Sequence, residues 1–140
     1  MGMAATRDNA GQIGARRPAR SGAGFVTNFT DTAGTVDVDR VADALRMTKG
    51  QLAETIGLGV ASLLKADRKT APRTQRRVLE MLEIIALVRD WAGGQTQAMA
   101  WYRSQPIPAL DGRTAEALVK SGEATAVRDY LDHLALGGFA

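Results

Sequence analysis

The chain has 140 residues, 45% of them hydrophobic and 24% charged, and its formal net charge at pH 7 is +3. This composition is typical of one soluble globular domain or of two small helical lobes that share a core. The absence of cysteine excludes disulfides and thiolate metal sites and fits a reducing cytoplasm. The longest apolar run, Ile84 to Val88, is far below the ~20 residues of a membrane helix, and no signal-peptide pattern begins the chain. We therefore expect a cytoplasmic protein.

The charge is unevenly placed along the chain. Between Lys65 and Arg77 there are six basic residues and one acidic residue, whereas from Gly93 onward four basic residues face five acidic ones. This asymmetry favours an anionic partner for the middle of the chain and a different partner for its end. The simpler alternative is a solvated basic face with no partner.

The first 35 residues carry no helical period. Residues 1–24 are rich in Gly, Ala and Arg and are expected to form a disordered basic tail. From Phe25 to Thr35 the alternation in "FVTNFT" predicts an extended arm.

A helical domain is predicted over residues 36–93. Its first helix runs from Val36 to about Met47 on an apolar stripe, and its second runs from Thr48 to Gly57. Thr48 and the glutamine three residues later form a capping-box pattern. A short third helix is expected from Val60 to Ala66.

A long fourth helix begins after Pro72 and ends at the Gly93–Gly94 pair. Its second half is apolar nearly all the way round, which predicts burial on every side. Because a short chain offers few places to bury such a helix, the pattern also predicts a homodimer.

Residues 94–140 are predicted to form a small lobe of three helices, Gln95–Ser104, Thr114–Lys120 and Glu123–Leu136. An apolar seam lies on the last helix, and Arg128 and Asp132 are spaced to form an ion pair on its outer side. Little strand signal is present beyond the arm, so the fold class is all-α. The residues of the seam are Ala124, Val127, Leu131 and Leu134.

The string "TKGQLAETIGLGVASLLKADR", from Thr48, resembles the helix-turn-helix of Xre/Cro-type repressors. Gly57 permits the turn, and Leu58 and Leu63 fill the angle between the helices. The second helix lacks the Arg, Asn or Gln side chains that read bases, so the sequence leaves open a DNA-contacting and a purely structural helix-turn-helix. Contacts to phosphates are predicted for basic residues that follow, namely Lys65, Arg68, Lys69, Arg73, Arg76 and Arg77.

The segment from Ala100 to Ala140 resembles the toxin-binding domain of the Xre/MbcA/ParS antitoxin family. The shared pattern is an aromatic helix, a Pro-x-Pro-x-Leu segment, a Gly-Arg-Thr turn, a Ser-Gly-Glu junction and a Gly-x-Phe ending. Asp111 and Ala115 depart from it, where the family often has a glycine and a proline. In chain order the matching residues are Trp101, Pro106, Pro108, Leu110, Gly112, Arg113, Thr114, Ser121, Gly122, Glu123, Gly137, Gly138 and Phe139.

The same residues have a physical reading of their own. Pro106 and Pro108 predict an extended strap, Asp111-Gly112 predicts a turn, and Thr114 and Ser121 are placed to cap the helices that follow them. All of these residues can be joints in a helical core with no partner. Arg113 is the exception, because a long cation in a tight turn has no packing role visible in the sequence.

The resemblance implies a type II antitoxin that binds a RES-domain toxin, an enzyme that consumes NAD by ADP-ribosylating a target or by degrading the dinucleotide. It further implies that the C-terminal end lies across the NAD cleft of the toxin, with Phe139 as an apolar anchor. An ordinary frayed terminus is the alternative for this tail. The expected toxin-binding residues are Leu110, Asp111, Gly112, Arg113, Thr114, Gly137, Gly138, Phe139 and Ala140.

An enzyme is not predicted. The single histidine, His133, is expected at the surface, and no phosphate loop, cofactor motif or spaced set of metal ligands is present. Trp91, Trp101 and Tyr102 are expected in the core. Two hypotheses remain: an antitoxin that also represses its own operon, and a free-standing DNA-binding repressor whose C-terminal lobe dimerises or senses a ligand.

Overall fold

The structure, a computed structural model, describes residues 24–138. Within this range the chain is helical, and its only β pairing is two isolated bridges. The predicted all-α class is therefore confirmed. In chain order the helices are α3 (Val38–Ala44), α4 (Lys49–Ile56), α5 (Ala61–Leu64), α6 (Ala66–Lys69), α7 (Pro72–Ala92), α8 (Gln95–Ser104), the 3₁₀ turn η2 (Pro108–Leu110), α9 (Ala115–Lys120), α10 (Ala124–His133) and the π-type turn η3 (Leu134–Gly138).

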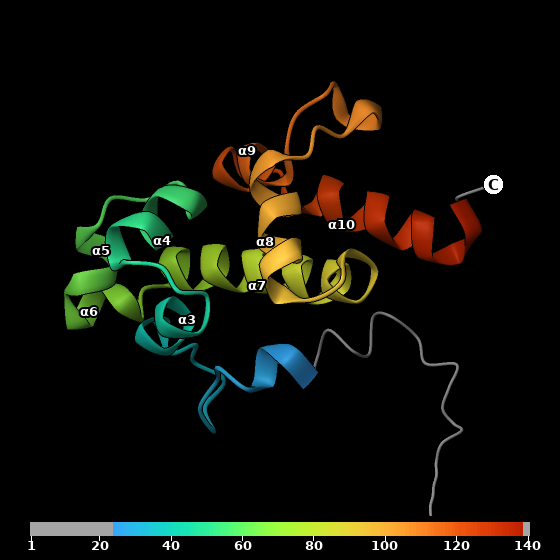
Figure 1. The fold of residues 1–140 in the computed structure, drawn as a ribbon. Coiled ribbons are helices and arrows are strands. Elements are labelled where there is room, and N and C mark those ends of the chain that lie inside the picture. The colour runs from blue at the N-terminus through green and yellow to red at the C-terminus, as the bar shows by residue number, and fades with distance from the viewer. Residues whose placement is uncertain (1–23, 139–140) are drawn as a thin grey trace, which may run out of the picture.

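Helix α7 is the central element of the fold. It runs across the molecule and contacts α4, α6, α8, α9 and α10 (Figure 1). The predicted burial of its second half is confirmed, but the cover comes from the same chain. The sequence-based reason for a homodimer therefore does not hold, and the homodimer stays a prediction. The buried residues of α7 are Thr74, Val78, Met81, Leu82, Ile84, Ile85, Ala86 and Val88.

The segment before α3 differs from the predicted extended arm. Residues 24–27 are helical, and Phe25 and Phe29 are buried edge-to-face with their ring centroids 5.3 Å apart. The guanidinium of Arg89, from α7, lies 4.7 Å from the centre of the Phe25 ring. The prediction was wrong because the i, i+4 spacing of the two phenylalanines suits one face of a helix as well as a strand alternation. Only the bridge between Thr30 and Val36 is extended. Of the predicted basic tail, residues 1–24, all but Gly24 lie outside the described residues.

The helix ends follow the capping signals of the sequence. Asp37 caps α3 by accepting from the backbone N–H groups of Asp39 and Arg40. Thr48 and Gln51 form the predicted capping box on α4, with N–H···O distances of 3.0 and 2.8 Å. α7 begins at Pro72 and ends at Gly93, whose φ is 102°, and α8 has the predicted bounds.

Two local predictions fail in the regions around α5 and α10. The predicted helix Val60–Ala66 is a single turn, α5, and the chain breaks at Lys65 before a second turn, α6. Arg128 pairs with Glu83 of α7 at 3.0 Å, and not with Asp132, because α10 packs against α7 and brings a carboxylate from another helix within reach. The predicted seam of α10 is otherwise correct, since Ala124, Val127 and Leu131 are buried and Leu134 is half-buried.

The aromatic residues are only partly in the core. Tyr102 is fully buried and Trp101 half-buried, whereas Trp91 is 41% exposed at the end of α7. His133 is exposed, as predicted. Among the described helices none is long and apolar enough to cross a membrane.

Candidate functional site

The Asp-Gly turn predicted from the sequence is present between η2 and α9. Asp111 and Gly112 both have positive φ, 64° and 74°, and the N–H of Arg113 donates to the carbonyl of Leu110 at 3.2 Å. Asp and Gly are the residues that tolerate this left-handed conformation best. The turn closes a short antiparallel bridge, in which the N–H of Ile107 donates to the carbonyl of Arg113 at 2.9 Å.

The predicted extended strap is shorter than expected. Pro106 precedes the bridge, but Pro108 starts the 3₁₀ turn η2, which its fixed φ permits in a first turn. Ile107, which the sequence analysis did not single out, is 1% exposed. The buried isoleucine between two prolines anchors the turn to the core. The alternation of proline and apolar residue in Pro106-Ile107-Pro108 is the sequence pattern that could have predicted this burial.

Arg113 has an internal partner that the sequence did not reveal. Its guanidinium binds both carboxylate oxygens of Glu123, at 2.8 and 3.2 Å, and the hydroxyl of Ser121 lies 2.6 Å from the same carboxylate. Arg113, followed by Ser121, lowers the pKa of Glu123. The bidentate pair joins the turn to the start of α10, and it lies at the surface, with side-chain exposures of 41% and 44%.

The two predicted caps have different outcomes. Thr114 caps α9 by accepting from the N–H of Ala117 at 3.1 Å, as predicted. Ser121 was expected to cap the last helix, but α10 begins after Glu123 without a side-chain cap. Ser121 instead ends α9, where its hydroxyl lies 3.0 Å from the carbonyl of Leu118.

The C-terminal end leads away from the core beyond α10. Gly137 has a φ of 102° inside η3, which is the helix interruption that glycine favours. Leu136 is 88% exposed. Gly138 is the last described residue, and the predicted contacts Phe139 and Ala140 lie outside the described residues. The turn lies at the top of Figure 1 and the end of α10 at the right, both away from α5 and α6 at the left.

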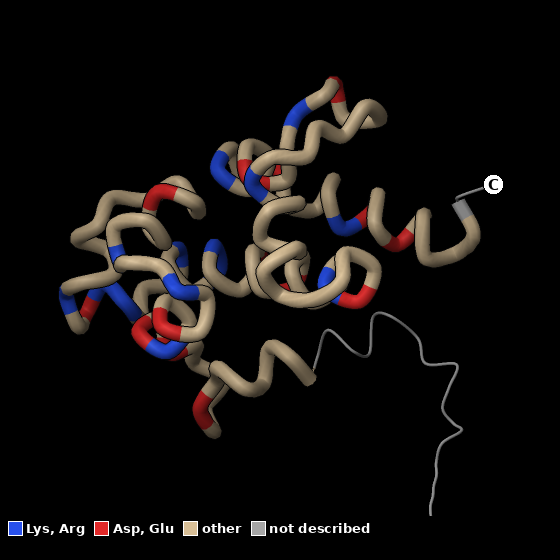
Figure 2. Tube along the Cα trace, in the orientation of Figure 1, with Lys and Arg blue, Asp and Glu red and all other residues tan. Residues whose placement is uncertain are grey.

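The basic residues predicted to contact phosphates gather at that opposite end (Figure 2). Lys65, Arg68, Arg73 and Arg76 are exposed. Arg77 is not available, because it donates to the carbonyls of Ile56 at 2.8 Å and Lys120 at 3.3 Å.

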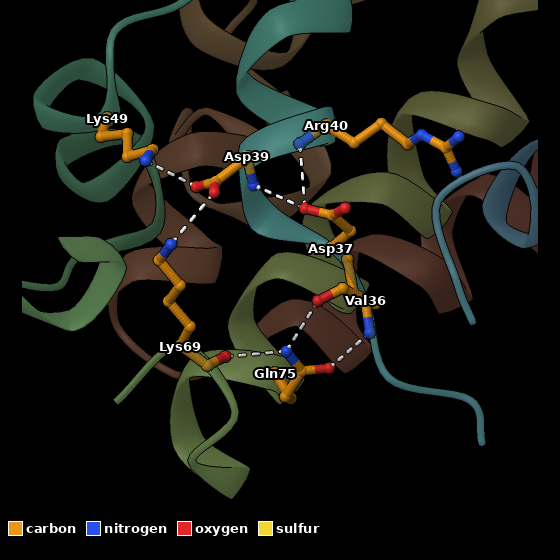
Figure 3. A network of polar contacts seen from close by, with 7 residues as sticks. All are labelled: Val36, Asp37, Asp39, Arg40, Lys49, Lys69 and Gln75. Atoms are coloured by element: carbon orange, nitrogen blue, oxygen red, sulfur yellow. Dashed lines mark hydrogen bonds and ion pairs between the residues drawn. The ribbon is translucent and has the colours of Figure 1, made fainter. Parts of the chain in front are cut away.

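Lys69 is engaged by Asp39, as Figure 3 shows. The two carboxylate oxygens of Asp39 lie 2.6 Å from the ammonium of Lys49 and 3.0 Å from that of Lys69. Lys49, followed by Lys69, lowers the pKa of Asp39. The side chain of Gln75 ties this corner to α7 by accepting from the N–H of Val36 at 2.7 Å and donating to its carbonyl at 3.0 Å.

The predicted helix-turn-helix corresponds to α4 and α5, and its second helix is a single turn. Gly57 ends α4 with a φ of 77°, Leu63 is fully buried and Leu58 half-buried. The second helix, α5, has only four residues; its Leu64 and the preceding N-cap residue, Val60, are exposed. One helical turn with apolar outward residues offers little hydrogen bonding to base edges.

Hydrogen bonds link helix α4 to helices α8 and α9 of the C-terminal lobe. The hydroxyl of Thr55, a fully buried residue of α4, donates to the carboxylate of Glu116 on α9. The Tyr102 hydroxyl donates to the carbonyl of Thr55 at 2.9 Å, and burial raises the pKa of Tyr102, so it stays protonated. Glu116, in the first turn of α9, therefore links α9 to α4.

The end of α7 and the elements that follow it resemble a known domain family. Residues 87–137 match the family model of the antitoxin Xre/MbcA/ParS C-terminal toxin-binding domain. This part of the chain is therefore similar to the toxin-binding domain of these antitoxins. The match covers 51 of the 140 residues. No significant match was found among curated proteins or among solved structures.

The matched residues begin inside α7 and end in η3. The description of the matched family implies a toxin as its partner. The turn 110–114 and Gly137 fall within the matched residues, whereas Gly138 and the two residues after it lie beyond them. Among residues 24–138, no group of three or more His, Cys, Asp or Glu residues is placed to hold a metal ion.

Proposed function

We propose that this chain is a type II antitoxin of the cytoplasm that neutralises a RES-domain toxin. The toxin-binding residues are those of the turn and of the tail, Leu110, Asp111, Gly112, Arg113, Thr114, Gly137, Gly138, Phe139 and Ala140. Together they cover the NAD cleft of the toxin and exclude its substrate, without catalysis by the antitoxin itself. The observation that carries the proposal is the match of residues 87–137 to the antitoxin toxin-binding domain.

The turn has the rigidity that an inhibitory contact needs. Its backbone is fixed by the bridge to Ile107, and its cation by the bidentate pair with Glu123. A side chain that is ordered before binding loses less entropy in a complex. The tail differs, because the exposed Leu136 and the left-handed Gly137 suit a segment that adapts to a cleft.

Co-expression with a RES-domain toxin encoded beside this chain tests the proposal. Wild-type antitoxin is expected to form a complex on size exclusion and to stop NAD consumption. Arg113→Ala should weaken inhibition by about ten- to a hundredfold, because a charged hydrogen-bonding group is lost from the interface. Glu123→Gln, which loosens Arg113 without removing it, should have a smaller effect.

Two controls make the outcome decisive. Arg73→Ala, a change of an exposed cation in the first turn of α7, should leave inhibition unchanged. Removal of residues 137–140 should weaken inhibition while the fold is retained. Unchanged NAD turnover in the presence of the wild-type chain, with no complex formed, would refute the proposal.

A second function, repression of the antitoxin's own operon, is favoured by the exposed cations Lys65, Arg68, Arg73 and Arg76 near α5 and α6. Because the exposed apolar residues at α5 are Leu64 and the N-cap residue Val60, we expect contacts to phosphates with little base readout. Binding to duplex DNA should then fall steeply with salt and vary little with sequence. Tight operator-specific binding by the chain alone would instead favour the alternative, a free-standing repressor, and sedimentation would test the predicted homodimer.

A further inference from the structure

The connection between α3 and α4 contains an arginine in a backbone conformation that normally belongs to glycine. Arg46 has a φ of 58°. It follows the end of α3, where the N–H of Met47 donates to the carbonyl of Ala42 at 2.9 Å and the N–H of Arg46 to that of Asp43 at 3.1 Å. This pair of bonds defines a Schellman motif, whose left-handed position is usually glycine.

Other helix ends of the described chain show what the motif prefers. α4 and α9 close with the same pair of backbone bonds, and the left-handed residue there is Gly57 or Gly122. A non-glycine residue in this conformation costs about 1–2 kcal/mol. Asp111, the other described non-glycine residue with positive φ, is a residue type that turns tolerate, whereas arginine is not. Nothing in the turn chemistry explains Arg46.

The position of Arg46 points to a reason. Arg46 lines a pocket of about 490 Å³ between the α3–α4 connection, α4, α8 and α9. This volume lies within the range of small-molecule sites, which are commonly found where two structural units meet. Its wall is apolar at Met47 and Met99, and its polar groups include Arg103 and Glu116.

The charges in the pocket are unbalanced. Among residues 24–138, Arg46 has no ion pair and no side-chain hydrogen bond, and Arg103 contacts Glu116 only through an ion pair of 3.4 Å from Nε. Glu116 also accepts from Thr55, and its side chain is only 16% exposed. The residues that line the pocket therefore include two arginines and one carboxylate, and only Arg103 is paired with that carboxylate, which leaves one positive charge for a ligand.

We propose that this pocket binds a monocarboxylate with an apolar body, whose carboxylate lies between Arg46 and Arg103 and whose body lies against Met47 and Met99. Guanidinium groups bind carboxylates through paired hydrogen bonds. The fixed carboxylate of Glu116 selects against ligands with two negative charges, such as phosphate monoesters, because it repels the second charge. The strained backbone at Arg46 is retained because it directs this cation to the pocket.

Calorimetric titration of the full chain tests the proposal with probes of defined chemistry. Octanoate represents a free acid, and acetyl-Gly-Gly-Leu represents the carboxyl end of a peptide. We expect at least one of them to bind saturably with a Kd of about 1 mM or tighter, and the tighter one identifies the source of the ligand. Octanol, which lacks the charge, and octyl phosphate, which carries more of it, should each bind at least about tenfold more weakly.

Arg46→Gly is the decisive variant, because glycine suits the φ of this position and the fold is not endangered. Its melting temperature should equal or exceed that of the wild type, while affinity for the carboxylate falls at least about tenfold. Lys120→Gln, which removes an exposed cation outside the pocket, should leave affinity unchanged. The proposal is overturned if neither carboxylate binds, if octanol binds equally well, if Arg46→Gly retains full affinity, or if that variant melts at a lower temperature.

Discussion

Replacement of Gly57 by alanine should separate α9 from α4 and destabilise the whole chain. A Cβ at this position would lie 3.0 Å from Cα and 3.1 Å from Cβ of Lys120, and 3.1 Å from Nη1 of Arg77. The first contact is with the backbone of α9, so α9 itself must move. That movement also stretches the hydrogen bonds of Arg77 to Ile56 and Lys120.

The magnitude has two parts. The φ of 77° at Gly57 costs alanine about 1–2 kcal/mol, and the forced shift of a packed helix costs about 1–3 kcal/mol more. The expected loss of unfolding free energy is therefore about 2–5 kcal/mol. At about 3–6 °C per kcal/mol for a chain of this length, the melting temperature should fall by roughly 6 °C or more.

Gly112→Ala is the matched control for this measurement. Gly112 has nearly the same φ, 74°, but a Cβ there would meet no atom within 4 Å. Only the conformational cost of about 1–2 kcal/mol is then expected. Thermal and urea unfolding followed by circular dichroism give both values. Equal losses for the two variants would show that the close approach of Lys120 contributes nothing and would refute the reasoning.

Two further predictions concern buried and charged links between the helices. Tyr102→Phe removes the hydroxyl that donates to the carbonyl of Thr55 and should lower the unfolding free energy by about 1–2 kcal/mol in urea titrations; no measurable change would mean that this buried bond is energetically neutral. Lys49 and Lys69 lower the pKa of Asp39, so the stability from these ion pairs is fully present above the ordinary carboxyl pKa of about 3.9 and is lost as pH falls through the depressed value. The difference in melting temperature between wild type and Asp39→Asn should therefore shrink below about pH 4, and a constant difference down to pH 2 would contradict the assignment.

The sequence was sufficient where a signal is local. Thr48 with Gln51, Pro72 with Gly93, and Asp111 with Gly112 each specify their caps and turns through atoms within a few residues, and the periods of α7 and α8 indicated the correct helices. The residue pattern of the last forty or so residues likewise indicated the family whose model matches residues 87–137.

The sequence was insufficient where a side chain finds its partner on another helix. Arg128 had a plausible partner four residues away, yet it pairs with Glu83, and Arg113 pairs with Glu123 across a helix. Arg77 looked like one more phosphate contact in a basic run, but it binds two carbonyls inside the molecule. Which of several exposed-looking charges becomes internal depends on how helices pack, and periodicity does not encode this.

The central helix has a mechanical consequence for any assembly that the chain forms. α7 has 21 residues and therefore spans about 31 Å, from the cations at its first turns to the residues where the family match begins. No kink interrupts the helix over these residues. If the two proposed functions hold, a toxin bound beyond one end of α7 and a duplex bound at the other would be held at a set distance and angle, so that copies bound side by side on DNA would fix the spacing of their toxins.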